Sequence, residues 1–504
     1  MEIYPLFYKT VPLRAQFVVV SFLTFVVLCG NGIYIGNITD MYSNMGEYNE
    51  PYIMGFNAVY IGLGLGLIFI GKLNLHLTNK SLVLAGLGSM LLLHLLIATT
   101  TSPQAIIAAC LILGFTKVMA LGPVYLDLIA SITKTFDIPK VYPYLYFLAL
   151  GGLYFTTWLM NVVTFEYNWQ ASYLIQYLAI AVAILLVALF VEKHPLRNKI
   201  PLHQSDIAGM LFFTSFLMLV NYIVVYGKVE NWFESPKIVA ASFAAPLSLL
   251  LFIRRELLVK RPFLPLWLFA KNDFAAGLCY FFILGVFLPV TFQTSLSSGV
   301  LHFESIRNSE INLYLVPGIL LGCVVSYFWY SKKLDGQLLM IIGFTAFVLY
   351  HLLMYRSFTN DLALQDFWLP SILKGFGMAL LYIAIGLFTT ARFPLVEVLK
   401  VSGTMVIVRS FLGSGIFSGI YNYLLARGRL QHLDYLSAST DANDAFIRQN
   451  ASGADFLRNI SNQATLAASK QLSGGIIIFG ILLLIVLILL YFYRKLKHRI
   501  VQIA

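Results

Sequence analysis

The chain of 504 residues is 59% hydrophobic and only 11% charged, with a mean hydropathy of +0.81. Soluble domains carry about 25% charged residues, so this composition excludes an ordinary soluble protein and indicates a polytopic membrane protein. The formal net charge of +11 does not indicate a nucleic-acid partner, because most of the basic residues lie in short segments between apolar runs.

Apolar runs along the chain are long enough to cross a lipid bilayer, for which a helix needs about 20 residues. We expect fourteen spans, near 15–38, 52–71, 81–100, 104–130, 142–164, 171–191, 206–227, 237–255, 273–297, 309–330, 337–355, 367–390, 399–424 and 473–493. With a cytoplasmic N-terminus, most lysines and arginines fall on the cytoplasmic side, as the positive-inside rule requires. The sequence therefore predicts an all-α, multi-pass protein of the inner cell membrane with both termini in the cytoplasm.

The segment 425–472, between the last two spans, is polar with scattered apolar residues at helical spacing. It is too long for a simple turn, and on the predicted topology it forms an external loop. Two interpretations are open: the loop caps the external face, or it docks a periplasmic adaptor that leads to an outer-membrane channel.

The cysteines and histidines show no metal-ligand pattern. The four cysteines lie far apart inside apolar runs, and the eight histidines form neither HxxxH nor HxxH. We therefore expect no metal and no cofactor, and a membrane-bound metalloenzyme such as a desaturase is not favoured.

Three basic residues lie inside predicted spans: Lys117, Lys374 and Arg409. A central arginine or lysine costs about 2.5–3.5 kcal/mol on insertion scales, so such residues persist where they face a bundle interior or a hydrated cavity. We expect Arg409 to point between helices, either bonding helix-end carbonyl groups or contacting the substrate. For Lys374, near the outer third of its span, snorkelling to the interface is the favoured interpretation.

Lys117 lies in the span 104–130, where a buried lysine is a candidate proton carrier. Asp127 follows ten residues later, about 15 Å along the helix at 1.5 Å per residue, so the two side chains cannot pair directly. We place Asp127 near the cytoplasmic mouth of the expected path.

Several stretches then occur in a characteristic order: 205-SDIAGMLFF, YGKVENWFESP, 252-FIRRELLVKRPFLPLWLFAKNDF, Gln293, 315-LVPG, 369-LPSILKGFGMALL and the Arg409 segment. This series resembles the 14-span drug:proton antiporter branch of the major facilitator superfamily. The resemblance covers nearly the whole chain. Where that branch has an acid in span one, the nearest polar residues here are Asn31 and Asn37; its span-four arginine is replaced by Gly114, with Lys117 one turn later.

The resemblance implies a major facilitator fold with two six-helix bundles and two helices inserted between them. The corresponding units are 1–191, 192–272 with the inserted helices, and 273–504. A substrate path would lie between the bundles, and rocking of the bundles would alternate its exposure. Asn31, Asn37, Lys117, Asp127, Gln293, Lys374 and Arg409 are the residues expected on the path or in coupling.

The function implied by the resemblance is secondary active transport, with proton-coupled efflux of amphipathic or toxic small molecules. The lipid bilayer, a small-molecule substrate and protons are the expected partners. Uptake or facilitated diffusion of an anionic or peptide-like solute is the alternative, because the three embedded cations suit an anion. A non-transporting membrane sensor is the remaining hypothesis.

Overall fold

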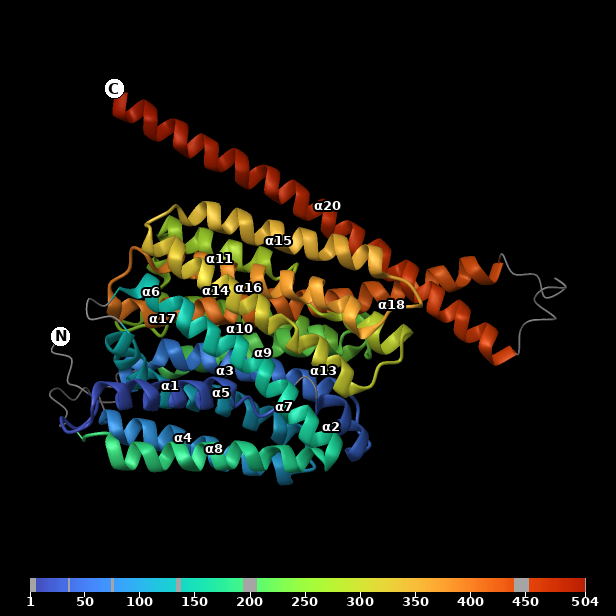
Figure 1. Cartoon of the computed structure of the whole chain (residues 1–504). Helices are drawn as coiled ribbons and strands as arrows, with labels where there is room; N and C mark the ends of the chain where they lie inside the picture. Colours follow the sequence, from blue (N-terminus) through green and yellow to red (C-terminus); the bar gives the residue numbers. More distant parts are fainter. Residues whose placement is uncertain are drawn as a thin grey trace.

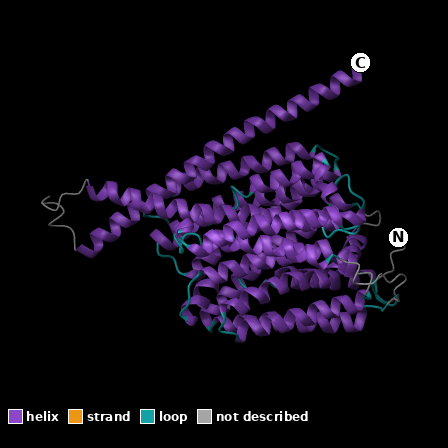
Figure 2. Cartoon of the chain, turned by 180° about the vertical axis from the view of Figure 1, so that it is seen from behind, coloured by secondary structure: helices purple, strands orange, loops and turns teal. Residues whose placement is uncertain are grey.

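The computed structural model describes residues 6–34, 37–73, 77–132, 137–193, 206–438 and 453–503. Within these ranges the chain is helical, and extended pairing is limited to one isolated bridge between Phe7 and Val191 (Figure 2). Twelve described helices are long and apolar enough to cross a membrane, and two further apolar helices are shorter. All of these segments fall on predicted spans, so the protein is an all-α, multi-pass membrane protein and is compatible with fourteen spans.

The first half of the chain forms a bundle around α5, against which α1, α3 and α4 pack (Figure 1). Buried Val59, Leu87 and Leu113 belong to its apolar core. The bounds of its elements are α1 Leu13–Cys29, α2 Ile38–Met45, α3 Glu50–Leu73, α4 Asn79–Thr99, α5 Pro103–Ile132, α6 Ile138–Tyr146, the π-helical segment η2 Phe147–Gly151, α7 Gly152–Glu166 and α8 Trp169–Phe190.

The last part of the chain forms a second bundle, in which α14 and α15 pack on α16. Its elements are α11 Asn272–Leu284, α12 Thr291–Thr294, the π-helical segment η6 Ser295–Val300, α13 Ser305–Leu313, α14 Leu315–Ser331, α15 Gly336–Ser357, α16 Trp368–Thr390, α17 Leu395–Val406, the π-helical segment η8 Ile407–Gly413, α18 Ser414–Ala438 and α20 Gly453–Ile503. Three short 3-10 turns, η4 Trp232–Glu234, η5 Leu266–Ala270 and η7 Leu364–Phe367, join neighbouring helices.

The two bundles repeat the same helix contacts. On α3, a Cβ at Gly62 would overlap the carbonyl oxygen of Leu111 on α5; on α14, a Cβ at Gly318 would overlap that of Ile372 on α16. The reverse contacts are made by Gly114 and Gly375, each against the backbone of the partner helix. Small residues at matching places let both helix pairs approach at the backbone. The halves are therefore internally related, with α3 corresponding to α14 and α5 to α16.

Two helices lie between the bundles in sequence, α9 Ile207–Tyr226 and α10 Pro236–Leu258. α9 packs on α3 of the first bundle and on α18 of the second, and α10 packs on α9. The buried side chain of Asn221 donates to the Met54 carbonyl oxygen and accepts a hydrogen bond from Asn57 on α3, both at 2.9 Å. On the side of the second bundle, a Cβ at Gly419 of α18 would lie 2.4 Å from a methyl carbon of Val224 on α9. The inserted pair thus covers the seam between α3 and α18.

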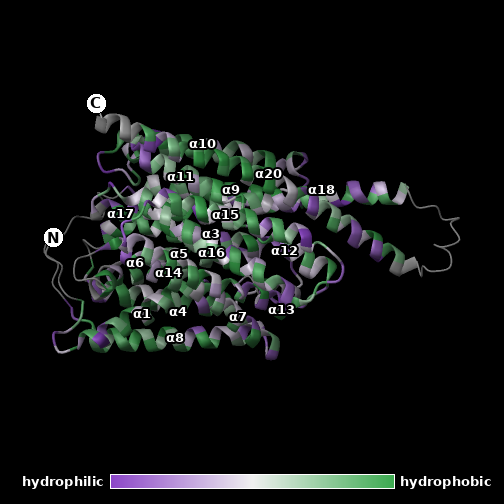
Figure 3. Cartoon of the chain, turned by 45° about the horizontal axis from the view of Figure 1, so that its top comes forward, coloured by the Kyte–Doolittle hydropathy of each residue, from purple (hydrophilic) through white to green (hydrophobic). Residues whose placement is uncertain are grey.

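The region expected as an external loop is a helical hairpin. Helix α18 continues to Ala438 and α20 begins at Gly453, and the two project together beyond the bundles (Figure 1). Arg429 and Ser461 join the two arms by a 2.6 Å hydrogen bond. Along the hairpin, polar and apolar residues mix, whereas the bundle is mainly apolar (Figure 3). Residues 439–452 lie outside the described part of the chain.

Candidate functional site

A cavity of about 930 Å³ lies between the two bundles, and it is bounded by both halves and by the inserted helix α9. Its lining includes Asn49, Glu50 and Lys228 together with Arg429 and Thr465 of the hairpin, and we call this end of the cavity its mouth. Its lining reaches inward to Leu67 on α3 and Leu399 on α17. These two helices cross nearby, where a Cβ at Gly64 would lie 2.9 Å from the Gly403 carbonyl oxygen. The cavity is therefore open at one end and closed by helix packing at the other.

The first helix of each bundle is interrupted beside the cavity. Helix α1 ends at Cys29, and Gly32 adopts a φ of +70° before the chain resumes; α11 ends at Leu284 and the chain runs through Pro289 before α12. Non-helical backbone at membrane depth is tolerated only where its polar groups find partners or face water. Interruptions at corresponding places in two halves are also a recognised mark of a binding site in transporters.

Side chains from neighbouring helices satisfy the free carbonyl groups at both interruptions. In the first half, the Lys117 Nζ donates to the Leu28 carbonyl oxygen at 2.9 Å, and the Tyr173 hydroxyl donates to that of Gly32. In the second half, the Tyr421 hydroxyl donates to the Val286 carbonyl oxygen at 2.7 Å. The breaks are thus held in place by the fold.

A second irregularity is also shared by the halves. The helix α6–α7 contains η2, and the helix α17–α18 contains η8; both π-helical segments contribute residues to the cavity wall. π-Bulges inside α-helices occur frequently at functional sites, because they redirect side chains out of the regular helical register. Arg409 lies in η8.

Arg409 lines the cavity within a group of aromatic rings. Its guanidinium carbon lies 4.3 Å from the Tyr382 ring centroid and 5.6 Å from that of Tyr146. One terminal nitrogen donates to the Tyr146 hydroxyl at 3.1 Å, while Nε has no hydrogen-bond partner. In the described part of the chain, Arg409 belongs to no ion pair. The residue therefore presents to the cavity a charged group whose described contacts are with neutral aromatic rings.

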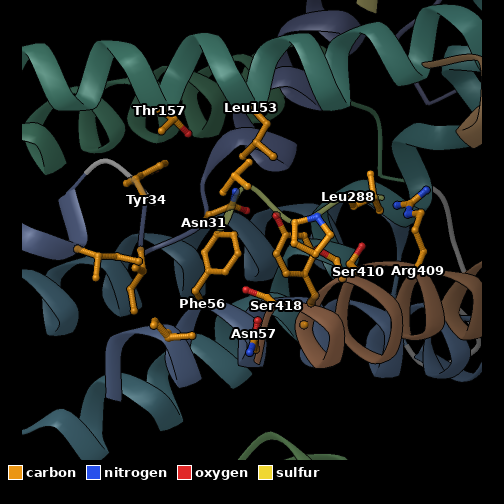
Figure 4. Close-up of a pocket in the computed structure, with 18 of the residues that line it drawn as sticks. Asn31, Tyr34, Phe56, Asn57, Leu153, Thr157, Leu288, Arg409, Ser410 and Ser418 are labelled. Atoms are coloured by element: carbon orange, nitrogen blue, oxygen red, sulfur yellow. The ribbon is translucent and has the colours of Figure 1, made fainter. Parts of the chain in front are cut away.

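Lys117 and Asn31 line the cavity from the first bundle. The Nζ of Lys117 is 2.5 Å from Asn31 Oδ1, and the lysine is only 2% exposed. Figure 4 shows Asn31 and Arg409 among the residues around the pocket, with Phe56 beside Ser418. The two halves therefore each supply one deep cation to the same space.

The charges of the lining are mainly positive. Lys117, Lys228, Arg409 and Arg429 line the cavity, and the acidic residue among the described lining side chains is Glu50 at the mouth. The remaining wall is largely apolar or aromatic. Its rings and chains include Phe56, Tyr60, Leu153, Tyr154, Leu288, Met378 and Tyr382. Such a surface suits a molecule with a large apolar body.

The other expected path residues lie elsewhere. Asn37 is buried and donates to Ser172 at 3.1 Å, and Gln293 is buried on α12; neither lines the cavity. Lys374 is 1% exposed and lies 5.0 Å from the Tyr350 ring centroid, away from the cavity, so the snorkelling interpretation was wrong. Asp127 is helical, but its side chain lies outside the described residues.

Sequence reasoning missed the tyrosines of the cavity and both helix interruptions. Tyr60, Tyr154 and Tyr382 are distributed over three helices, and nothing in their local sequence separates them from lipid-facing tyrosines. The interruptions did leave a signal, Gly30 and Gly32 in the first half and Gly285 with Pro289 in the second. No group of three or more potential metal ligands occurs among the described residues.

Comparison with known proteins gives a family match over most of the chain. The sequence profile of the Major Facilitator Superfamily matches residues 20–418. The multidrug export protein EmrB of Haemophilus influenzae is 22% identical over 224 residues, which is 42% of each chain. The chain thus aligns with less than half the length of that relative.

Solved structures share the fold at low identity. A proton-dependent oligopeptide transporter matches with a TM-score of 0.58 and 13% identity, over 95% of this chain and 98% of its own. The nucleoside transporter NupG matches with a TM-score of 0.52 and 12% identity, over 95% and 99%. The human organic anion transporter MFSD10 (TETRAN) matches with a TM-score of 0.52 and 12% identity, over 94% and 100%. At this low sequence identity, the similarity to these structures shows a shared fold and nothing more.

Proposed function

The chain belongs to the major facilitator superfamily and is a membrane transporter, and we propose that it exports amphipathic small molecules in exchange for protons by alternating access. The observation that carries this proposal is the cavity between the two bundles. Its volume of about 930 Å³ accommodates a drug-sized molecule, and its wall combines apolar and aromatic side chains with a few polar groups. The export protein EmrB supplies the direction of transport by similarity.

The contacts between the bundles support a rocking motion. At the closed end, α3 and α17 meet at Gly64 and Gly403, where the backbones approach closely and the side chains of Ile68 and Ile407 pack against the glycines. At the open end, the bundles are separated by the cavity. A crossing of this kind lets the halves pivot, so that the open end closes and the closed end opens.

Lys117 is our candidate for the proton-carrying group. Its ammonium group is buried, lines the cavity and contacts two neutral acceptors, Asn31 and the Leu28 carbonyl oxygen. Because no acid in the described residues pairs with Lys117, loss of its proton would leave no carboxylate unpaired. Proton binding to Lys117 and substrate binding in the same cavity can therefore exclude one another, which is what exchange requires.

The topology proposed with this function places both termini in the cytoplasm of a cell with an inner membrane. The hairpin then extends outside, and the structure corresponds to an outward-open state. A periplasmic adaptor connected to an outer-membrane channel is the proposed partner of the hairpin, because α18 and α20 project beyond the bundles there.

A toxicity panel on cells with and without the protein tests export. We expect protection against some amphipathic compounds, lost in Arg409→Ala and Lys117→Ala. Inverted membrane vesicles then separate coupling from export. With a proton gradient imposed, substrate accumulation should collapse when a protonophore is added. Accumulation that is insensitive to the protonophore would contradict proton coupling. In the toxicity panel, cells with the protein that are as sensitive to every compound as cells without it would contradict export.

Uptake of an anionic or peptide-like solute is the second candidate, and the cations that line the cavity, which form no ion pair with a described acid, favour it. The direction of net movement in right-side-out vesicles distinguishes it from export. A sensor without transport would bind ligand but move none across the membrane.

A further inference from the structure

We infer that the transported molecule is an amphipathic organic anion, whose acidic group binds Arg409 at mid-depth and meets a second cationic position at Arg429 in the mouth. This inference rests on the proposed transport function and specifies its substrate class. It also makes the hairpin part of the substrate path, since Arg429 belongs to α18 beyond the bundle.

The surroundings of Arg409 leave its charge available to a ligand. Tyr146, Phe281 and Tyr382 lie 5.6, 5.8 and 4.3 Å from the guanidinium carbon and offer ring faces but no negative charge. One terminal nitrogen bonds the Tyr146 hydroxyl, which leaves other N–H groups for a ligand. A membrane-embedded cation is costly, and no described acid pairs with Arg409, so binding of an anion there is favoured because it supplies the counter-ion.

The planar shape of the guanidinium group further restricts the class of ligand that can bind. Its planar fork matches the two oxygens of a carboxylate, sulfonate or phosphate, and it stacks on aromatic faces at the same time. Lys117 is less suited to this role, because its Nζ already donates to Leu28 and Asn31. Arg409 is therefore the primary anion site.

The walls near Arg409 suit the rest of such a molecule. Tyr60, Leu153, Tyr154 and Met378 provide an apolar and aromatic surface in the same cavity. Among the described lining side chains the acid is Glu50 at the mouth, so a cationic substrate finds no described acid beside Arg409. Like charges from Arg409 and Lys117 would repel it.

The second cationic position, Arg429, lies at the mouth of the cavity. Arg429 lines the cavity, and its Nη2 is fixed by the 2.6 Å hydrogen bond to Ser461 on the other hairpin arm. Leu425 and Ala426 of α18 and Thr465 of α20 line the cavity beside it. Lys228 of the inserted pair faces the same opening. An anion that moves between Arg409 and the outside thus passes a cation at the hairpin, which raises its local concentration.

A pair of permanently charged probes tests the substrate class. Naphthalene-1-sulfonate and naphthyl-trimethylammonium share an aromatic body and differ in the sign of their charge. The purified full chain is reconstituted into liposomes of zwitterionic lipid, and a proton gradient is imposed. We expect at least tenfold faster movement of the sulfonate than of the ammonium. Equal or faster movement of the ammonium overturns the anion inference while the transport function stands; movement of neither probe overturns both.

Arg409→Gln and Arg409→Lys test the primary site. The Gln variant should reduce sulfonate binding by about tenfold to a hundredfold, as expected when a hydrogen bond to a charged group is lost. The Lys variant keeps the charge but not the fork, and should restore part of the affinity. Thermal unfolding shows whether each variant is folded. Unchanged sulfonate affinity in a folded Arg409→Gln variant overturns this site.

Arg429→Gln tests the mouth position. We expect a severalfold rise in KM for the sulfonate at low salt with kcat unchanged, and a smaller rise at high salt because exposed charges are screened. Arg429→Lys should restore the KM. The matched control is Arg356→Gln, an exposed arginine in the last turn of α15 that does not line the cavity. If Arg429→Gln and Arg356→Gln behave alike, the hairpin carries no anion position.

Discussion

Lys117 and Asn31, which are 86 residues apart in the sequence, form a 2.5 Å hydrogen bond at the interruption of the first span. The same ammonium group also donates to the Leu28 carbonyl oxygen, near the last turn of α1. One side chain on α5 therefore fixes the backbone of α1 and supplies a charge to the cavity. The interruption and the cation depend on each other.

Lys117→Met removes both hydrogen bonds while keeping most of the side-chain volume. The Leu28 carbonyl oxygen and Asn31 then lose a buried donor, which should lower the free energy of unfolding by about 1–3 kcal/mol per unsatisfied group. Thermal unfolding in detergent measures this loss. Lys117→Arg should restore the hydrogen bonds in part. An unfolding temperature equal to that of the parent protein would contradict the role of Lys117 in holding the interruption.

Asn57 and Asn221 offer a test of the inserted helices. Asn221→Leu leaves Asn57 and the Met54 carbonyl oxygen without their partner, and we expect a loss of about 1–3 kcal/mol in stability. The double variant Asn57→Leu/Asn221→Leu should lose less than the sum of the single variants, because the two residues share one interaction. Strict additivity of the unfolding free energies would show that the pair is not coupled.

Gly64→Val tests the crossing between α3 and α17. The new side chain would meet Ile407 and the Gly403 carbonyl oxygen, so the halves must separate or the crossing must shift. We expect at least a tenfold loss of transport in liposomes. Gly88→Val on α4 is the matched control, since a Cβ there meets nothing within 4 Å. Equal transport by the two variants would argue against a pivot at Gly64.

Much of the fold was predictable from the sequence, since long apolar runs identify spans whatever their packing. The sequence also singled out Arg409 and Lys117, because a cation in an apolar run is conspicuous, and both residues line the cavity. Hydropathy does not distinguish a continuous span from an interrupted one, so it did not predict the helix interruptions at Gly32 and Pro289. The tyrosine group around Arg409 depends on helices far apart in sequence, and local patterns contain no information on it.

The hairpin shows a second limit of prediction from sequence. Its apolar residues at helical spacing indicated helix, but its length and polarity favoured a loop between spans. Pairing of α18 with α20 stabilises both arms outside the bundle, through contacts such as the bond between Arg429 and Ser461. Tertiary contacts of this kind decide the outcome for amphipathic segments.

We expect the folding stability to depend on pH through the turn between α9 and α10, which lies outside the membrane-spanning segments. Hydrogen bonds from Ser235 and Lys237 hold the pKa of Glu230 below its usual range. A carboxyl group with a lowered pKa stabilises the folded state above its ordinary pKa of about 4.3, and this contribution is lost as the pH falls below that value. Glu230→Gln should therefore lower the stability at pH 7, change it little at about pH 3, where the parent carboxyl is itself protonated, and so flatten the acid side of the stability profile. An unchanged profile between about pH 3 and 5 would show that these hydrogen bonds do not persist in solution.

Lys374 provides the last prediction, because its buried ammonium group has no hydrogen-bond partner among the described residues and contacts the face of Tyr350. Burying a charge without a partner is unfavourable, and a cation–π contact of about 2 kcal/mol offsets only part of that cost. Lys374→Met keeps the packing volume and removes the charge, so it should raise the unfolding temperature by several degrees. Thermal unfolding of the full chain measures this, with Lys333→Met on an exposed turn as the control. A fall in stability would mean that Lys374 holds α16 through an interaction stronger than its contact with Tyr350.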